Sequence, residues 1–184
     1  GQHYDDNMSE VFFRDLGISA PEINIGIGGG SHASMTGQML MKLEQAMLEH
    51  KPDWVLVFGA TNSTIAAALA AAKIHIPVAH IEAGLRSYDR KMPEEINRVV
   101  TDQISDRLYT TERTAEENLA REGIPAERVY FAGNVMIETV VFGRERARSP
   151  ADTLRRSGFD PLILSHSRGY RLVTLHPPST LDPP

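Results

Sequence analysis

Residues 54–81 read WVLVFGATNSTIAAALAAAKIHIPVAHI, and this stretch decides the fold class. It contains two short apolar runs, 54–58 and 76–81, separated by an alanine-rich segment. A continuous apolar run between Pro52-Asp53 and Gly59 is typical of a strand that is buried on both faces. The alanines favour helix, and the length between the runs suits a right-handed crossover between parallel strands. The stretch therefore predicts a βαβ unit.

A further helix is predicted to begin at Pro93. Proline fits the first turn of a helix, and Glu94 and Glu95 suit the positive end of the helix dipole. We expect the buried face of this helix to consist of its apolar positions, which are Ile96, Val99, Val100 and Ile104.

The rest of the chain continues the alternation of strand and helix. Upstream, apolar residues at helical spacing predict a helix that ends near His50, and the glycines of 26–30 are interpreted as a turn before it rather than as a phosphate-binding loop. Downstream, strands are predicted at 107–110, 129–132 and 172–175, and helices at 112–122 and 135–147. This pattern predicts an α/β fold with a Rossmann-like parallel sheet and flanking helices.

Length and composition limit the domain organisation. A chain of 184 residues accommodates one α/β domain and the beginning of a second. The stretch 148–169 is rich in polar residues and contains Ser149-Pro150 and Asp160-Pro161, so we interpret it as a weakly structured connection. We therefore predict one domain at 1–148, and the interdomain connection with the start of a second domain at 149–184.

The charge and composition argue against several function classes. A formal net charge of −5 is unsuited to a general electrostatic grip on nucleic acid. No apolar run approaches the roughly 20 residues that cross a membrane, and the start Gly1-Gln2-His3 does not resemble a signal peptide, so it reads as an internal starting point. With no cysteine there is no disulfide framework and no thiolate metal site, and we expect a cytoplasmic protein.

Charged side chains follow two of the predicted strands or begin the helices after them. Glu82 and Arg86 come directly after the strand ending at residue 81, where ligands of open α/β sheets bind. They also fit a solvated ion pair, just as Glu94 and Arg98 fit an ordinary helical pair at i and i+4. Two carboxylates from successive loops at one sheet edge favour acid and base catalysis. His176 follows the last predicted strand, although a lone histidine is more often structural.

Several of these segments, in this order, resemble the non-hydrolysing UDP-N-acetylglucosamine 2-epimerases. The matching motifs are GQHYDDNM (1–8), GGGSH (28–32), KPDWVLVFG (51–59), HIEAGLR (80–86), MPEEINR (92–98), GNVM (133–136) and LVTLH (172–176). The resemblance implies the amino-terminal half of a GT-B-type two-domain fold and a homodimer. It also implies a role in cell-envelope polysaccharide biosynthesis. The implied reaction interconverts UDP-GlcNAc and UDP-ManNAc by elimination and re-addition of UDP, without a nicotinamide, metal or other cofactor.

The resemblance also assigns roles to particular residues. Glu82 and Glu94 match the two catalytic glutamates of the family, and His176 matches its catalytic or phosphate-contacting histidine. The resemblance places Arg86 and Arg98 in substrate-binding positions, where they would support the carboxylates rather than react. At the beginning of the chain, Gln2 and His3 match a segment that contacts a regulatory UDP-N-acetylglucosamine in some bacterial members.

The chain departs from the family pattern at two motifs. The family's Gly-Asp-Thr motif is Gly59-Ala60-Thr61 here, and alanine has no carboxylate to exchange a proton or bind a sugar hydroxyl. After His176, the family's arginine and glutamate are replaced by the run 177–180, PPST. The family's first strand and most of its second half have no counterpart in these residues.

We expect from these departures an epimerase with impaired activity. The alternative is a catalytically silent sugar-nucleotide-binding or dimerisation module of the same family. A glycosyltransferase-like protein of similar fold is a further alternative, which the motifs at 80–86 and 92–98 disfavour.

Overall fold

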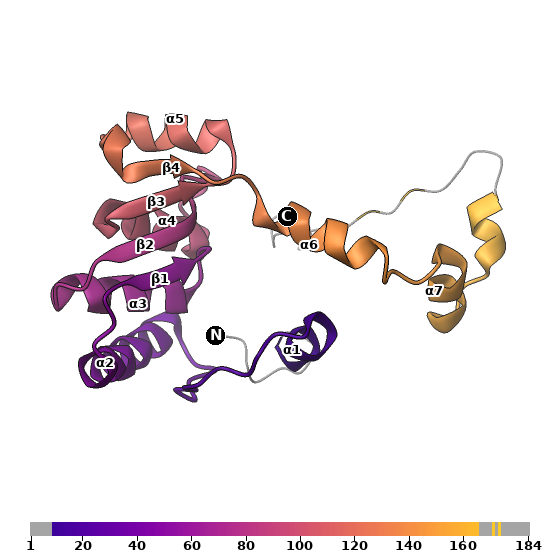
Figure 1. Cartoon of the computed structure of the whole chain (residues 1–184), viewed down its shortest axis with the longest axis horizontal. Coiled ribbons are helices and arrows are strands. Elements are labelled where there is room, and N and C mark those ends of the chain that lie inside the picture. The colour runs from indigo at the N-terminus through magenta and orange to yellow at the C-terminus, as the bar shows by residue number, and fades with distance from the viewer. Residues whose placement is uncertain (1–8, 166–170, 172, 174–184) are drawn as a thin grey trace. The chain divides into compact units, whose positions relative to one another are not determined.

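The sheet is parallel, and its strands lie side by side in chain order. The computed structural model describes residues 9–165, 171 and 173. The strand order is β1-β2-β3-β4, as Figure 1 shows. The strands are β1 (Val55–Phe58), β2 (Val78–Ala83), β3 (Arg107–Thr110) and β4 (Val129–Phe131). All of them belong to the compact unit Gly1–Val135, which confirms the predicted parallel α/β fold.

The predicted helices also form in this unit. They are α2 (His32–His50), α3 (Asn62–Lys73), α4 (Pro93–Ile104) and α5 (Arg113–Arg121). Two further helices of this unit, α1 (Glu10–Leu16) and the short η2 (Ala126–Arg128), were not predicted. Glycines with positive φ, Gly29 and Gly30, make the expected turn before α2. Thr61 and Thr64 form a capping box at the start of α3. The side chain of Thr61 accepts from the backbone N–H of Thr64, and the side chain of Thr64 accepts from the backbone N–H of Thr61.

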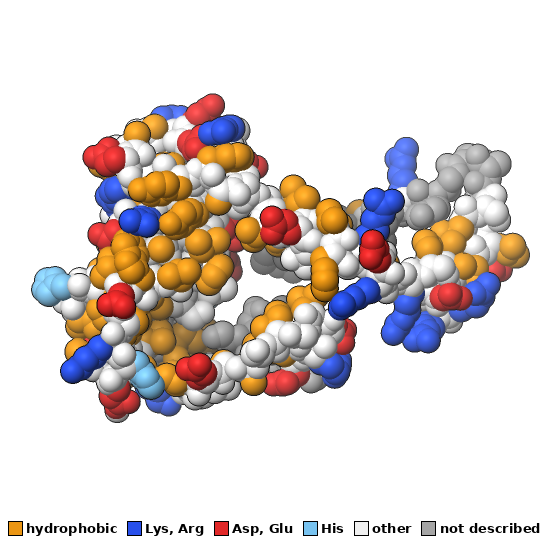
Figure 2. Space-filling view, viewed as in Figure 1, with side chains coloured by type: hydrophobic (Ala, Val, Ile, Leu, Met, Phe, Trp, Pro, Cys, Tyr) orange, Lys and Arg blue, Asp and Glu red, His pale blue; other side chains and the backbone are white. Residues whose placement is uncertain are grey.

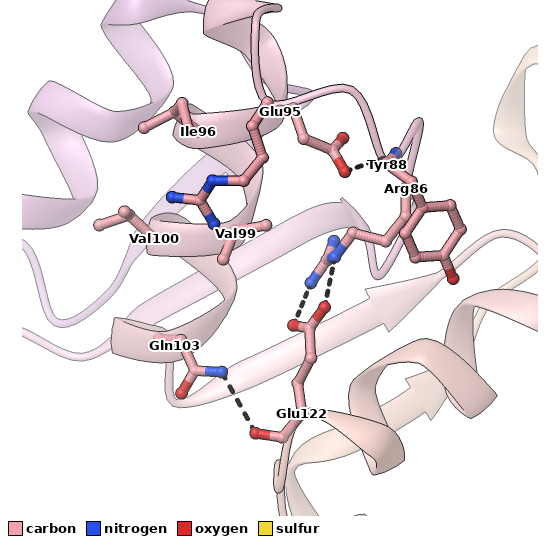
Figure 3. Close-up of a pocket in the computed structure, with 9 residues that line it drawn as sticks. Arg86, Tyr88, Glu95, Ile96, Val99, Val100, Gln103 and Glu122 are labelled. Atoms are coloured by element: carbon pink, nitrogen blue, oxygen red, sulfur yellow. Dashed lines mark hydrogen bonds and ion pairs between the residues drawn. The ribbon is translucent and has the colours of Figure 1, made fainter.

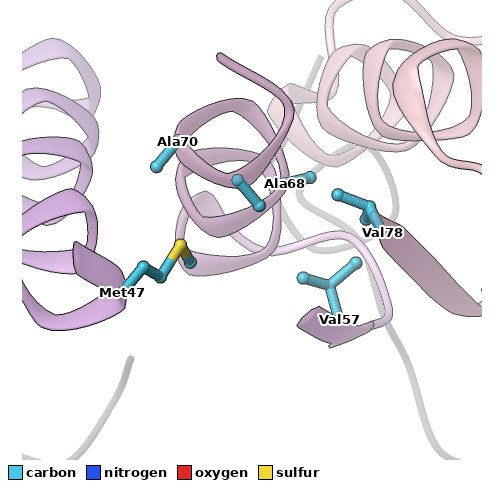
Figure 4. Close-up of a cluster of buried hydrophobic side chains, with 6 residues drawn as sticks. Met47, Val57, Ala68, Ala70 and Val78 are labelled. Atoms are coloured by element: carbon cyan, nitrogen blue, oxygen red, sulfur yellow. The ribbon is translucent and has the colours of Figure 1, made fainter. Parts of the chain in front are cut away.

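Alanines allow α3 to lie close to both the sheet and α2. Ala68, Ala70 and Ala71 are fully buried and pack with Met47 of α2 and with the inward residues of β1 and β2 (Figure 4). A helix surface of methyl groups lets neighbouring backbones approach closely, and alanine has the highest helix propensity. The alanine-rich segment of the sequence therefore forms the centre of the core.

One prediction about the strands is wrong, because β1 is buried on one face only. Val57 is 4% exposed, whereas Leu56 and Phe58 are 56% and 64% exposed. Right-handed crossovers between strands that pair in chain order place every connecting helix on the same side of the sheet. Hydrophobic side chains therefore gather over the other face of the strands, which is turned toward the viewer in Figure 2.

The predicted buried face of α4 is also partly wrong. Ile104 does pack against the core, but Ile96 and Val100 are each 36% exposed. The buried side chains of α4 are instead polar: Glu95, Asn97, Thr101 and Asp102. Each of the two acids meets hydrogen-bond donors of the loop after β2, and a buried polar group is stable where it has such partners.

The unit Met136–Pro184 contains most of α6 (Val135–Arg144) together with α7 (Pro150–Arg156) and the short η3 (Pro161–Ser165). The stretch after residue 148 is thus more regular than expected. Ser149 caps α7 by accepting from the backbone N–H of Asp152, and proline occupies the first turn. The domain division at 148/149 stays a prediction, and most of the predicted strand 172–175 lies outside the described residues. Within the described part of the chain, no helix has the length and apolar character to cross a membrane.

Candidate active site

Glu82 lies where β2 leaves its regular pairing with β3. The register between these strands shifts between Ile81 and Ala83, so that Glu82 is the extra residue of a bulge. Its φ is 72°, a left-handed conformation that is costly for a residue with a side chain. The carboxylate lies next to the turn after β1, since a Cβ added to Gly59 would be 3.3 Å from Glu82 Oε2. The bulge therefore directs an exposed carboxylate to the carboxyl end of the sheet.

The turn after β1 is held from two sides. The ring of His80 in β2 lies 2.8 Å, Nε2 to oxygen, from the carbonyl of Gly59. Asn97 of α4 donates from Nδ2 to the carbonyl of Ala60 at 3.0 Å and to Oδ1 of Asn62 at 3.2 Å. These bonds join the first turns of α4 to the same loop that lies beside Glu82.

Glu94 and Glu95 are neighbours in the sequence with different surroundings. Glu94 is exposed in the first turn of α4, and, like Glu82, it forms no hydrogen bond or ion pair to any residue that the structure describes. Glu95 is 3% exposed and accepts hydrogen bonds from the backbone N–H groups of Ser87 and Tyr88 and from the Ser87 hydroxyl. Glu94 is therefore available to a ligand, whereas Glu95 is occupied by the protein.

The hydrogen bonds of Glu95 determine its charge state and the shape of the loop after β2. Burial by itself would raise the pKa of Glu95, but the backbone and hydroxyl donors and the nearby Arg98 guanidinium together lower it. The same bonds hold Tyr88, whose φ of 58° is left-handed. An ionised Glu95 thus stabilises a strained loop conformation.

Arg86 points into the domain and pairs with two carboxylates. Its Nε and Nη2 donate to Glu122 at 2.7 and 2.6 Å (Figure 3). Its Nη1 lies 2.8 Å from Asp102 Oδ2. Burial alone would lower the pKa of this guanidinium, but the bond to Glu122 and the charge of Asp102 raise it above its ordinary value. With its side chain 1% exposed, Arg86 links the loop to α4 and to the end of α5, and its predicted role in binding substrate has no support from this geometry.

Arg98 keeps unused hydrogen-bonding capacity. Its Nη1 lies 3.5 Å from Glu95 Oε2, and its side chain is 19% exposed. Its Nε is buried and has no hydrogen-bond partner among the described residues. A buried donor without a partner is costly, and a ligand acceptor would remove that cost.

A cavity of about 460 Å³ lies along α4 (Figure 3). It is lined by Arg86, Tyr88, Arg90, Glu95, Ile96, Val99, Val100, Gln103 and Glu122. Neither Glu82 nor Glu94 is among these residues, so this cavity is separate from the predicted catalytic carboxylates.

Comparison with known proteins shows the family of this chain. The family model described as UDP-N-acetylglucosamine 2-epimerase matches residues 1–184. The chain belongs to the UDP-N-acetylglucosamine 2-epimerase family. Among its relatives, a UDP-N-acetylglucosamine 2-epimerase homolog from Methanococcus maripaludis is 55% identical over 99% of this chain and 49% of its own length. The UDP-2,3-diacetamido-2,3-dideoxy-D-glucuronate 2-epimerase of Pseudomonas aeruginosa is 48% identical over 100% of this chain and 49% of that protein.

Solved structures of the epimerase family share the fold. The Methanocaldococcus jannaschii UDP-GlcNAc 2-epimerase in complex with UDP-GlcNAc and UDP matches with a TM-score of 0.80 and 43% identity, over 85% of this chain and 44% of that one. The Neisseria meningitidis enzyme bound to UDP-GlcNAc matches with a TM-score of 0.73 and 32% identity, over 82% and 41% of the two chains. The fold is therefore the Rossmann-like amino-terminal half of the GT-B-type architecture. The chain spans about half the length of the curated relatives it matches.

Three epimerase-family positions named from the sequence, His176, Gln2 and His3, lie outside the described residues. Their assigned roles, and the effect of Pro177-Pro178, stay predictions. Of the remaining candidates, the structure brings Glu82 and the α4 turn that carries Glu94 to the loop after β1, whereas Arg86 lies in the interior.

The sequence interpretation missed the residues that hold this epimerase-family site together, which are His80, Glu95, Asn97 and Asp102. Spacing contained a signal for two of them. Glu95, Arg98 and Asp102 stand at i, i+3 and i+7, which places them on one face of a helix. Because α4 has a charged face and an apolar face, either face could be turned toward the interior. The hydrogen-bond partners in the loop after β2 determine that the charged face is buried.

Proposed function

We propose that the protein is a UDP-N-acetylglucosamine 2-epimerase with impaired activity. The observation that carries this proposal is Glu82, a carboxylate without a partner among the described residues. A strained bulge holds it at the carboxyl end of the sheet, beside a loop that is tied to the helix of Glu94. Strain of this kind is typical of functional sites. Family membership and relatives named as epimerases support the proposal.

The proposed reaction needs a base and an acid near C2 of the sugar. A carboxylate removes the C2 proton and the C1–O bond to the diphosphate breaks. UDP departs, and the sugar becomes a 2-acetamidoglucal with a double bond between C1 and C2. The second carboxylate, which exchanges its proton with solvent, then delivers a proton to the opposite face of C2, and UDP adds back to C1, which inverts C2. Glu82 and Glu94 are the proposed acid and base because both are exposed and lack partners among the described residues.

Arg98 is proposed to bind the substrate through the exposed part of its side chain, and His176 to contact the diphosphate. The substrate class is a UDP-2-acetamido sugar, and the relative from Pseudomonas aeruginosa, named for a diacetamido-glucuronate, widens the choice of sugar. A cytoplasmic location, a role in cell-envelope polysaccharide synthesis and a regulatory site at Gln2 and His3 belong to the same proposal.

A specific observation favours the second candidate, a catalytically silent module. Ala60 stands where the family motif has aspartate, and its backbone carbonyl still accepts from Asn97. The loop is thus built without the carboxylate. Loss of an acid or base typically lowers a rate by about 10²–10⁴-fold.

The two candidates are distinguished by exchange of the C2 proton in D₂O, followed by NMR on UDP-N-acetylglucosamine. We expect exchange near the buffer rate for the chain, and at least about 10²-fold faster exchange for Ala60→Asp. Adding Glu82→Gln to Ala60→Asp should abolish that gain, while Glu116→Gln on α5 should leave it unchanged. No gain in Ala60→Asp, or a gain that persists without the Glu82 carboxylate, would reject the proposed catalytic site.

We also propose a homodimer that uses the outward face of α4. Ile96 and Val100 are partly exposed there beside the half-buried Val99, although α4 is otherwise well packed. An apolar stripe on one helix can pair with the same stripe of a second copy about a two-fold axis. The homodimer implied by the family resemblance supports this choice of partner.

A further inference from the structure

His80 is a buried titratable residue that the proposed chemistry does not use. Its side chain is 0% exposed, in the middle of β2. Nδ1 lies 2.6 Å from Asp102 Oδ1, and Nε2 lies 2.8 Å from the carbonyl oxygen of Gly59. Both ring nitrogens are therefore within hydrogen-bond distance of an oxygen.

The partners determine the protons on the ring. A backbone carbonyl only accepts, so Nε2 must carry a hydrogen. The carboxylate of Asp102 already accepts from Gly84 N–H at 3.1 Å and pairs with Arg86, both through Oδ2. An ionised carboxylate only accepts as well, which requires a hydrogen on Nδ1. His80 is thus the donor in both bonds.

The surrounding charges suit a doubly protonated ring. His80, Asp102, Arg86 and Glu122 form one chain of contacts in which positive and negative groups alternate. Asp102 contacts the ring from α4, Arg86 reaches Asp102 from the loop after β2, and Glu122 reaches Arg86 from the end of α5. On the strand of His80 itself, Glu82 is the other charged residue, and its carboxylate lies beside the turn after β1. A buried charge is tolerated where it is paired and hydrogen-bonded, and here each has an opposite neighbour.

We propose that His80 is a positioning residue, an imidazolium that holds the Gly59 carbonyl and so keeps the turn 59–61 against Glu82. Other bonds also anchor the turn, among them the Asn97 bond to Ala60, the backbone bond from Gly59 N–H to Ile81 O and the bond from Thr61 N–H to the Thr64 hydroxyl. His80 is the anchor that joins it to the charged interior of the domain. The importance for Glu82 rests on the proposed function, whereas the protonation state and the hold on the turn do not.

The protonation state is tested by ¹⁵N NMR of the histidine rings in the full chain, with the His80 signals assigned by their loss in His80→Gln. We expect both ring nitrogens of His80 to carry hydrogens, because each lies against an oxygen that only accepts. A signal of an unprotonated ring nitrogen for His80 at neutral pH would overturn the proposal. This measurement needs only the unmodified chain and the assignment.

The hold on the turn is tested by amide hydrogen exchange at Gly59 and Thr61, whose N–H groups are hydrogen-bonded. His80→Gln keeps one donor but removes the charge, and Asp102→Asn removes the partner of the ring. We expect exchange at both amides to be at least about 10-fold faster in each variant, with α2 amides unchanged. His50→Gln on the surface is the matched control. Unchanged exchange in both variants, or equal acceleration throughout the domain, would reject a positioning role independently of any activity.

Discussion

Glu82 shows, at the scale of a single residue, how backbone conformation serves a site. Its left-handed φ of 72° follows from the bulge between Ile81 and Ala83 and orients the carboxylate toward Gly59. Such a conformation costs roughly 1–2 kcal/mol for a residue with a Cβ. The pairing of the surrounding strands must offset this cost, because the Glu82 side chain forms no hydrogen bond or ion pair with the described residues.

The strain predicts an unusual order of stability for two variants. Glycine adopts positive φ without steric cost, so Glu82→Gly should be about 1 kcal/mol more stable than Glu82→Ala in urea unfolding. At Gln45, in the middle of α2, the order should reverse, since glycine weakens a helix by about 0.5–1 kcal/mol relative to alanine. If Glu82→Ala is the more stable variant, the left-handed conformation is not an intrinsic cost at this position.

Glu95 predicts a pH dependence of stability. Its folded pKa is lowered, so its contribution is fully present above the unfolded glutamate pKa of about 4.3 and is lost as the pH falls through the folded value. We expect Glu95→Gln to be less stable than the unmodified chain by more than about 1 kcal/mol at neutral pH. The difference should shrink below about pH 4.3. A gap that is constant between about pH 6 and 3 would show that ionisation of Glu95 does not stabilise the fold.

At the scale of elements, α4 and α5 hold the loop after β2 by buried polar contacts. Asn118 of α5 donates to the carbonyl of Gly84 at 3.0 Å and accepts from the hydroxyl of Tyr88 at 2.6 Å, while Glu95 and Asp102 act from α4. Gly84 allows the closest approach. Its φ is 80°, and a Cβ there would lie 2.6 Å from the carbonyl oxygen of Ala115.

This contact predicts the effect of a single methyl group. Gly84→Ala should lower the free energy of unfolding by about 2–4 kcal/mol, from steric overlap added to backbone strain. Gly123→Ala is the matched control, because its φ is 79° but nothing lies within 4 Å of the added Cβ. We expect that control to lose only about 1 kcal/mol. Equal losses in the two variants would mean that α5 retreats from Gly84 without cost.

The elements also show what the sequence predicts well and what it does not. Apolar runs and alanine-rich segments placed every strand and every α-helix from α2 to α6 correctly to within a few residues, but not the short η2. The buried face of α4 was predicted wrongly because the spacing of apolar residues does not show which polar side chains have hydrogen-bond partners in the interior. Glu95 and Asp102 are buried by their bonds to a loop, and no local pattern encodes that loop's conformation.

The roles of the candidate site residues stay predictions, and the structure adds where the described ones lie. Glu82 and Glu94 were named from their place after and before regular elements, which a parallel sheet gathers at one edge. Arg86 looked like a ligand-binding side chain because its spacing from Glu82 does not reveal that Asp102 and Glu122 surround it. The burial and pairing of the Arg86 side chain depend on residues that are distant from it in the sequence.

At the scale of the whole molecule, exposed apolar side chains on α4 bear on assembly. Val100 belongs to the outward stripe and also lines the cavity along the helix. A buried hydrophobic contact of this kind commonly supplies much of the energy of an interface. The proposed homodimer makes the stripe a contact between two copies.

A charge in this stripe should weaken the dimer. We expect Val100→Asp to raise the dimer dissociation constant at least about 10-fold, because two aspartates would meet without partners near the two-fold axis. Light scattering after gel filtration over a range of concentrations gives the constant, and Leu48→Asp, at a 56% exposed site on α2, is the control. A monomeric unmodified chain, or equal effects of both variants, would exclude this face as the interface.

The strand order β1-β2-β3-β4 has a consequence for how the domain is made. Each strand after β1 pairs with the one that precedes it in the chain, and each connecting helix packs against at least one of the strands that it joins. Contacts between segments near in sequence form quickly, because little chain entropy is lost in closing the intervening loop. The sheet can therefore grow by one strand at a time as the polypeptide leaves the ribosome, without waiting for its carboxyl end to be synthesised.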